Sequence, residues 1–249
     1  MREVTRANKG VTSFLARRAE AAAANEDWSR RELGEWLGVL DLGCTLLEAA
    51  AREVAEHLLS RGSEVSKSEQ SILLLSMWAV SRAGSTCTLL LQGFPTDAGA
   101  LMRALMKVEA VQRLLASDAE SADAWMRNEE LKVGDFLSMV TKQDPSFGQA
   151  WGSLGTVVHP NRQAVINQFD ELGDVARLRG GGARRPEQLH KVAANFGVQV
   201  KRQLHLLEDT FEHLTWSAAL HTLIEKYELL LNQMHEAVHR RWPRSATID

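Results

Sequence analysis

The stretch that decides the fold is 66-SKSEQSILLLSMWAVSRAGSTCTLLLQGFPTDAGALMRALMKVEAVQRLL-115. Ser66 and Glu69 match a capping box, in which a hydroxyl and a carboxylate each satisfy a free backbone N–H at the start of a helix. Two apolar rows follow at i+3/i+4 spacing, and a helix that is apolar on two rows is expected to lie inside a domain. The first row is Ile72, Leu75, Ala79, Ala83, Thr86 and Leu90, and the second is Leu73, Met77, Val80, Cys87 and Leu91.

The segment Gly93-Phe94-Pro95 is expected to end this helix, because glycine favours the position after a helix and proline cannot continue one. Thr96 or Asp97 is the predicted cap of the next helix. That helix points one apolar row inward: Leu101, Leu105, Val108 and Leu115. The stretch therefore predicts an antiparallel helical hairpin at the core.

Helical signals continue on both sides of this hairpin. Before it we expect an amphipathic helix over 4–24, a new start at 27–29, a short helix to Leu40, and a longer one over 42–59 that closes at Gly62. After it we expect short helices over 118–130, 133–140 and 144–159. Residues 161–185 lack an apolar period and predict a Gly/Arg-rich loop, with short extended pieces at 164–169 and 175–178.

Two long helices, from Pro186 to about Phe211 and from about Trp216 to Arg241, complete the prediction. The fold class is all-α: a multi-helix bundle with an antiparallel core hairpin and two long C-terminal helices. We predict one domain over 1–249, made of N-terminal helices (1–62), the core part (66–160), the loop (161–185) and the C-terminal helical pair (186–242).

Composition limits the function classes. The chain has 249 residues and a formal net charge of -3, which argues against a basic surface over the whole protein for nucleic acid or anionic lipid. Cys44 and Cys87 both lie in apolar stretches, so we expect two reduced core thiols rather than a disulfide framework or a zinc cluster. No signal peptide is evident, and Arg82 and five Ser/Thr residues interrupt the apolar run 72–91, so we expect a cytoplasmic protein without a membrane span.

The sequence His235-Glu236-Ala-Val-His239 matches H-E-x-x-H, in which two histidines on one helical face bind zinc and the glutamate serves as general base. Arg240 and Arg241 follow the motif, and only ten residues remain for a third ligand. The alternative is an exposed helix that carries these His and Glu residues on its polar side and binds no zinc. In that case we expect no cofactor.

Arg82 and Arg103 lie on the two helices of the core hairpin. Buried arginine needs a carboxylate, a cluster of carbonyl groups or an anionic ligand. Glu109 or Asp97 is the expected structural partner, and an anion site gripped by two guanidinium groups is the alternative. His159, before Pro160 and a Gly-rich loop, either joins such a site or caps its own helix.

The segments Ser81-Arg82-Ala-Gly84, Gly93-Phe-Pro-Thr-Asp97, Leu101-Met-Arg103-Ala-Leu105 and Leu154-Gly-Thr-Val-Val158-His159-Pro160 resemble a widespread bacterial family of helical proteins of unknown function. That family is distantly similar to the HEPN domains, which are helical nucleotide-binding and ribonuclease domains of toxins and phage-defence systems. The resemblance covers about 66–165. This chain departs from the family at Lys107, where the family has an acidic residue.

The resemblance implies a HEPN-like interaction or regulatory module without catalytic activity, in bacterial stress or phage defence. Its partner would be another protein or a second copy of the chain. The alternative is a metal-independent ribonuclease that uses Arg82, Arg103 and His159, with the arginines of 179–185 binding RNA. HEPN ribonucleases carry Arg-x(4–6)-His, and no arginine stands at that distance before His159. Arg52 and His57 have that spacing, but an exposed helix face explains them as well. A zinc hydrolase at His235, Glu236 and His239 is the third possibility, so whether the protein is an enzyme stays open at this point.

Overall fold

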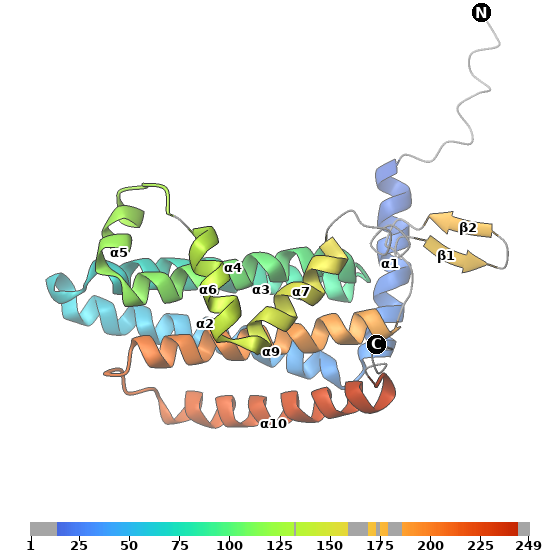
Figure 1. Cartoon of the computed structure of the whole chain (residues 1–249). Helices are drawn as coiled ribbons and strands as arrows, with labels where there is room; N and C mark the ends of the chain where they lie inside the picture. Colours follow the sequence, from blue (N-terminus) through green and yellow to red (C-terminus); the bar gives the residue numbers. More distant parts are fainter. Residues whose placement is uncertain (1–13, 132, 159–168, 173–174, 179–185, 244–249) are drawn as a thin grey trace, which may run out of the picture.

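The computed structural model describes residues 14–131, 133–158, 169–172, 175–178 and 186–243, and the fold is an all-α multi-helix bundle (Figure 1). The helices are α1 (Phe14–Leu33), α2 (Trp36–Arg61), α3 (Lys67–Leu91), α4 (Pro95–Ser117), α5 (Ala119–Met126), α6 (Val133–Gln143), α7 (Pro145–Val158), α9 (Pro186–Thr210) and α10 (Ala218–Arg241), with a 3-10 turn at Gly62–Glu64. Two short strands, β1 (Phe169–Leu172) and β2 (Val175–Leu178), pair antiparallel.

The core hairpin predicted from the sequence is confirmed as α3 and α4. The Ser66 hydroxyl accepts the Glu69 backbone N–H at 3.2 Å, and the Glu69 carboxylate accepts the Ser66 backbone N–H at 2.7 Å, which completes the capping box. Gly93 adopts a left-handed φ of 73° between the helices. The predicted cap at Thr96 or Asp97 is wrong: α4 begins at Pro95, whose fixed φ and missing N–H suit the first helical position.

The N-terminal half differs from the prediction in where its helices break. The expected start at Val4 lies outside the described residues. The expected restart at 27–29 is wrong, because α1 runs through these residues to Leu33, and the chain turns at Gly34, which has a φ of 50°. Ser29 is fully buried, so tertiary packing overrides the turn tendency of the Asp-Trp-Ser sequence. The longer helix accordingly begins at Trp36, and Gly62 ends it as predicted.

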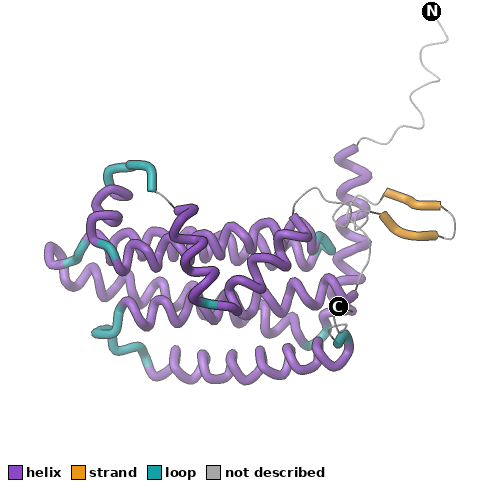
Figure 2. The backbone as a smooth tube through the Cα atoms, in the orientation of Figure 1, coloured by secondary structure: helices purple, strands orange, loops and turns teal. Residues whose placement is uncertain are grey.

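The long helices α2, α3, α4, α9 and α10 lie lengthwise along one another, and α1 stands across one end of the bundle (Figures 1 and 2). α9 packs on α2, α3, α4 and α10, while α6 and α7 pack on α4. The predicted C-terminal pair is confirmed, with α9 beginning at Pro186. Of the extended pieces, 175–178 is confirmed as β2, whereas 164–168 lies outside the described residues.

Tyr227 of α10 holds three of these helices together. Its side chain is fully buried, and its hydroxyl donates to the Gly197 carbonyl oxygen of α9 at 3.0 Å. A Cβ built at Gly43 of α2 would lie 2.9 Å from the Tyr227 hydroxyl oxygen and 3.1 Å from two ring carbons. Burial raises the pKa of the Tyr227 hydroxyl above its usual value. A residue without a side chain is therefore required where the ring end meets α2.

Replacing Gly43 by Ala should lower the free energy of unfolding by about 1–3 kcal/mol, because the rigid ring of Tyr227 cannot move away from the new methyl group. Gly38, one and a half turns earlier in α2, has no atom within 4 Å of a built Cβ. Gly38→Ala should instead raise stability by up to about 1 kcal/mol through helix propensity. Urea unfolding of both variants measures the difference, and equal stabilities would show that Tyr227 does not constrain α2.

Candidate functional site

The two arginines predicted to share a site each lie on a tryptophan ring. The Arg82 guanidinium is 4.6 Å from the ring centre of Trp78, one turn earlier in α3, and the side chain is partly exposed. The Arg103 guanidinium of α4 is 4.1 Å from the ring centre of Trp151 in α7. His159 lies outside the described residues, so the three-residue cluster stays a prediction.

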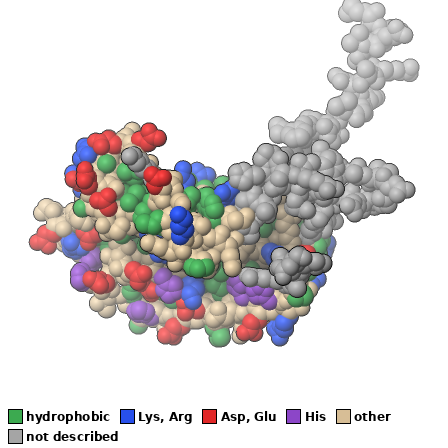
Figure 3. All heavy atoms as spheres, viewed as in Figure 1, with side chains coloured by type: hydrophobic (Ala, Val, Ile, Leu, Met, Phe, Trp, Pro, Cys, Tyr) green, Lys and Arg blue, Asp and Glu red, His purple; other side chains and the backbone are tan. Residues whose placement is uncertain are grey.

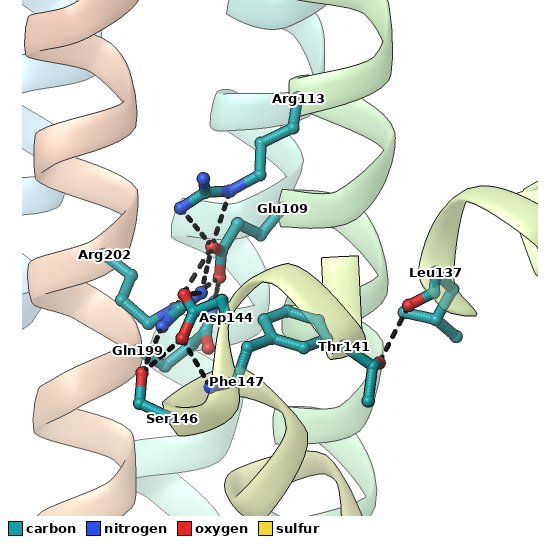
Figure 4. Close-up of polar contacts among 9 residues, drawn as sticks. All are labelled: Glu109, Arg113, Leu137, Thr141, Asp144, Ser146, Phe147, Gln199 and Arg202. Carbon is teal, nitrogen blue, oxygen red and sulfur yellow. Dashed lines mark hydrogen bonds and ion pairs between the residues drawn. The ribbon is translucent and has the colours of Figure 1, made fainter. Parts of the chain in front are cut away.

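Glu109, one of the carboxylates expected to pair with these arginines, binds different ones. Its carboxylate is fully buried and accepts the Arg202 guanidinium of α9 at 2.8–3.1 Å and the Arg113 guanidinium at 2.9 Å (Figure 4). The Gln199 amide donates to the same carboxylate at 2.9 Å. In place of the expected Arg82 or Arg103, Glu109 therefore binds Arg113, one turn later in α4, and Arg202, which is 93 residues away.

Asp144, just before α7, extends this ion network, which we define as Glu109, Arg113, Asp144, Gln199 and Arg202. Its carboxylate accepts Arg202 at 2.7 Å and also caps α7 by accepting the Phe147 backbone N–H at 3.0 Å. Partial burial raises the pKa of Asp144, but hydrogen bonds from Ser146, Phe147 and Arg202 outweigh it and hold that pKa well below the usual range. Burial lowers the pKa of Arg202, whereas the two carboxylates raise it above its usual value.

A groove of about 810 Å³ lies beside the ion network, with Arg113, Asp144, Met139 and Leu206 among its lining residues. Two of the charged residues at its edge are already paired, Arg113 by Glu109 and Asp144 by Arg202, and Asp209 also lines it. Charged groups that satisfy one another in this way fix helix positions. The ion network therefore serves α4, α7 and α9 as a structural clamp.

The H-E-x-x-H motif lies near the end of α10. Nε2 of His235 lies 3.3 Å from the Ala194 carbonyl oxygen, which can only accept, so this nitrogen carries a hydrogen and has no free lone pair for zinc. Burial lowers the pKa of His235. Glu236 and His239 are exposed. The described part of the chain contains no group of three or more His, Cys, Asp or Glu residues placed to hold a metal ion.

The most unusual surface of the described chain is the outer face of α3. Leu74, Met77 and Trp78 are 50%, 57% and 37% exposed, and we call these residues together with Ser81 and Arg82 the α3 strip. The first apolar row of α3 is buried or nearly so, as predicted, but the expectation that both rows are interior is wrong. α1, α2, α4, α5 and α9 contact α3 and still leave this face uncovered.

A groove of about 550 Å³ adjoins the strip at Leu74 and is lined by Val111, Trp125, Met126, Asn128, Glu129, Leu131 and Val133. Met126 is itself 39% exposed. Lys67 and Asp123 form an ion pair at 2.9 Å, which ties α5 to the start of α3 beside this groove. Carboxylates gather over α5 and the turn after it, which we call the acidic rim, and Glu129 of this turn lines the groove (Figure 3).

Exposed apolar side chains that adjoin one another mark interaction surfaces in soluble proteins. Tryptophan and arginine are also the residue types that most often dominate binding energy at protein interfaces, and the strip pairs Trp78 with Arg82. On length and composition alone, α3 is the one helix among the described residues that could cross a membrane, with 28% of its most apolar window buried. A core helix of a soluble protein satisfies the same criteria.

Comparison with protein-family models, curated proteins and solved structures finds no match to this chain. The resemblance to HEPN domains accordingly stays a prediction from the residues quoted above.

Sequence reasoning identified Arg82 but missed the strip around it. The signal that could have revealed it is the unbroken run Ile72-Leu-Leu-Leu75, because consecutive apolar residues point in every direction around a helix. Such a helix needs neighbours on all sides. The side of α3 that is left without a neighbouring helix depends on how helices distant in the sequence pack. No local sequence pattern encodes this packing.

The ion network predicts unequal costs for losing the two arginines that bind Glu109. Arg202→Leu should lower the free energy of unfolding by about 3–5 kcal/mol, since its side chain is 13% exposed and a buried carboxylate loses its main partner. Arg113→Leu is the matched control: that side chain is 40% exposed and only one turn from Glu109, and its loss should cost about 0–1 kcal/mol. Denaturant unfolding measures both, and equal costs would contradict the assignment of Arg202 as the main partner.

Proposed function

We propose that this chain is a helical interaction protein without catalytic activity, and that the α3 strip is its docking surface. The observation that carries the proposal is the exposure of Leu74, Met77 and Trp78 on neighbouring turns of one helix. Fully burying a side chain of this size yields about 1.5–3 kcal/mol, so covering the exposed parts of all three provides several kcal/mol toward association.

A second copy of the same chain is the partner that the charges of this surface favour. Between Gln70 and Leu91, Arg82 is the only charged residue of α3, so two strips can face each other with little like-charge repulsion. In an antiparallel pairing with its two-fold axis at Trp78, Arg82 of one copy meets Leu74 of the other. Leu74 adjoins the turn that contains Glu129, which Arg127 already binds, and Glu130, so the turn that Arg82 meets carries a net negative charge.

The resemblance stated above suggests the wider setting of this interaction: a HEPN-like module in a bacterial cytoplasm, in stress response or phage defence. That setting depends on the resemblance of segments 81–84, 93–97, 101–105 and 154–160, whereas self-association depends on the exposure of Leu74, Met77 and Trp78. Self-association through α3 is separate from it and is testable with the purified chain.

The dimer proposal predicts that the protein elutes and scatters light at twice its 27.7 kDa chain mass, and that Met77→Lys converts it to a monomer. Two lysines facing each other in an apolar interface are costly to desolvate. Leu59→Lys is the matched control, because Leu59 is an 81% exposed apolar residue on α2, outside the strip, and this variant should remain dimeric. Light scattering after gel filtration, over a range of concentrations, measures the mass.

A wild-type chain that stays monomeric at every concentration would contradict this dimer, as would a dimeric Met77→Lys protein. Flotation of the monomeric chain with lipid vesicles, abolished by Met77→Lys, would assign the strip to a membrane instead.

The ribonuclease alternative predicts cleavage of single-stranded RNA in EDTA, and our proposal predicts none. Our proposal would be contradicted if the wild-type chain cleaved the RNA, Arg103→Ala or His159→Ala abolished the cleavage, and Lys107→Ala retained it. That result would identify the protein as a ribonuclease. Lys107 is the appropriate control because it is an exposed cation one turn after Arg103 on the same helix. Gel analysis of a labelled RNA distinguishes these outcomes.

A further inference from the structure

The two cysteines of the chain meet between α2 and α3. The Sγ atoms of Cys44 and Cys87 are 3.3 Å apart, and both residues are partly exposed free thiols. They lie 43 residues apart in the chain. The sequence placed each cysteine in an apolar stretch but gave no sign that the two stretches face each other at this point.

The sulfur atoms are close enough to react with each other. A disulfide has an S–S bond of about 2.05 Å, so the two sulfurs need to approach by little more than about 1 Å, a movement that small rotations of both side chains supply. Asp41 and Tyr227 are ionisable groups whose charges interact with the pair. The thiol of Cys87 is also 3.9 Å from the Leu40 carbonyl oxygen.

The pKa values of the two thiols are shifted in opposite directions. A hydrogen bond from Cys87 lowers the pKa of Cys44, against the opposing effects of burial and of Asp41. The same hydrogen bond, burial and the Cys44 charge raise the pKa of Cys87. The lower pKa makes Cys44 the thiol that loses its proton first, and a thiolate is the reactive form of cysteine.

We propose that Cys44 and Cys87 are an oxidation site at which a hydroperoxide forms a reversible disulfide between α2 and α3. The Cys44 thiolate attacks one peroxide oxygen, the O–O bond breaks, and the departing hydroxide takes up a proton to become water. Cys44 is then a sulfenic acid. Cys87 attacks its sulfur, the S–O bond breaks, the S–S bond forms, and the second water leaves with the proton of Cys87. Two thiols have lost two electrons and two protons, and hydrogen peroxide has become two waters.

This modification acts on the bundle and leaves the α3 strip untouched, since neither cysteine belongs to the strip. The disulfide closes a long loop, residues 44–87, that contains most of α2 and most of α3, and closing a long loop restricts the unfolded chain. Oxidised protein should therefore melt at a higher temperature than reduced protein, by roughly 5–10 °C.

The test treats the full-length reduced protein with hydrogen peroxide, then denatures it, alkylates its free thiols and measures the intact mass. We expect the loss of both alkylation sites in a monomeric chain, a raised melting temperature, and recovery of both sites with dithiothreitol. Cys87→Ser should halt at a Cys44 sulfenic acid that dimedone traps, whereas Cys44→Ser should react far more slowly because burial and Asp41 still raise the pKa of Cys87 in that variant.

Two results would overturn the proposal: both thiols still alkylated after peroxide, or disulfides only between chains on a non-reducing gel. The mass measurement on the wild-type protein alone distinguishes these two results from the expected one. The proposal can therefore be tested even if either serine variant fails to fold.

Discussion

The carboxylate of Glu109 imposes the strongest constraint on this bundle. A carboxylate without solvent contact is tolerated only when opposite charge and hydrogen-bond donors surround it, and here Arg202, Arg113 and Gln199 do so. Because Arg202 also binds Asp144, the arrangement fixes α9 against both α4 and the start of α7. The positions of three helices are thereby determined by charge rather than by apolar packing alone.

The two helices of the hairpin differ in which kind of side chain they bury and which they expose. α4 turns Glu109 inward and pairs it completely, whereas α3 leaves large apolar side chains in solvent at Met77 and Trp78. In our proposal, the side of the hairpin that exposes Trp78 is the side that associates with a second copy of the chain. In the same proposal, the acidic rim around α5 favours a partner that brings a cation such as Arg82.

Local sequence signals predicted the parts of the fold that depend on neighbouring residues. The capping box at Ser66, the turn at Gly93 and the helix start at Pro186 all involve groups within a few residues of one another. The break between α1 and α2 was predicted wrongly because burial of Ser29 outweighs its turn tendency. The Glu109–Arg202 contact and the exposure of the α3 strip depend on helices that meet only after folding, so periodicity alone could not reveal them.

The connection between α3 and α4 is so short that these helices meet almost as soon as each forms, and the entropic penalty of closing that loop is small. The clamp at Glu109 instead requires a chain segment 93 residues away, so it assembles after the hairpin. The topology therefore predicts that the hairpin forms first and that α9 docks late. Contacts that form late in folding mainly slow unfolding, so the docking of α9 is expected to lower the unfolding rate.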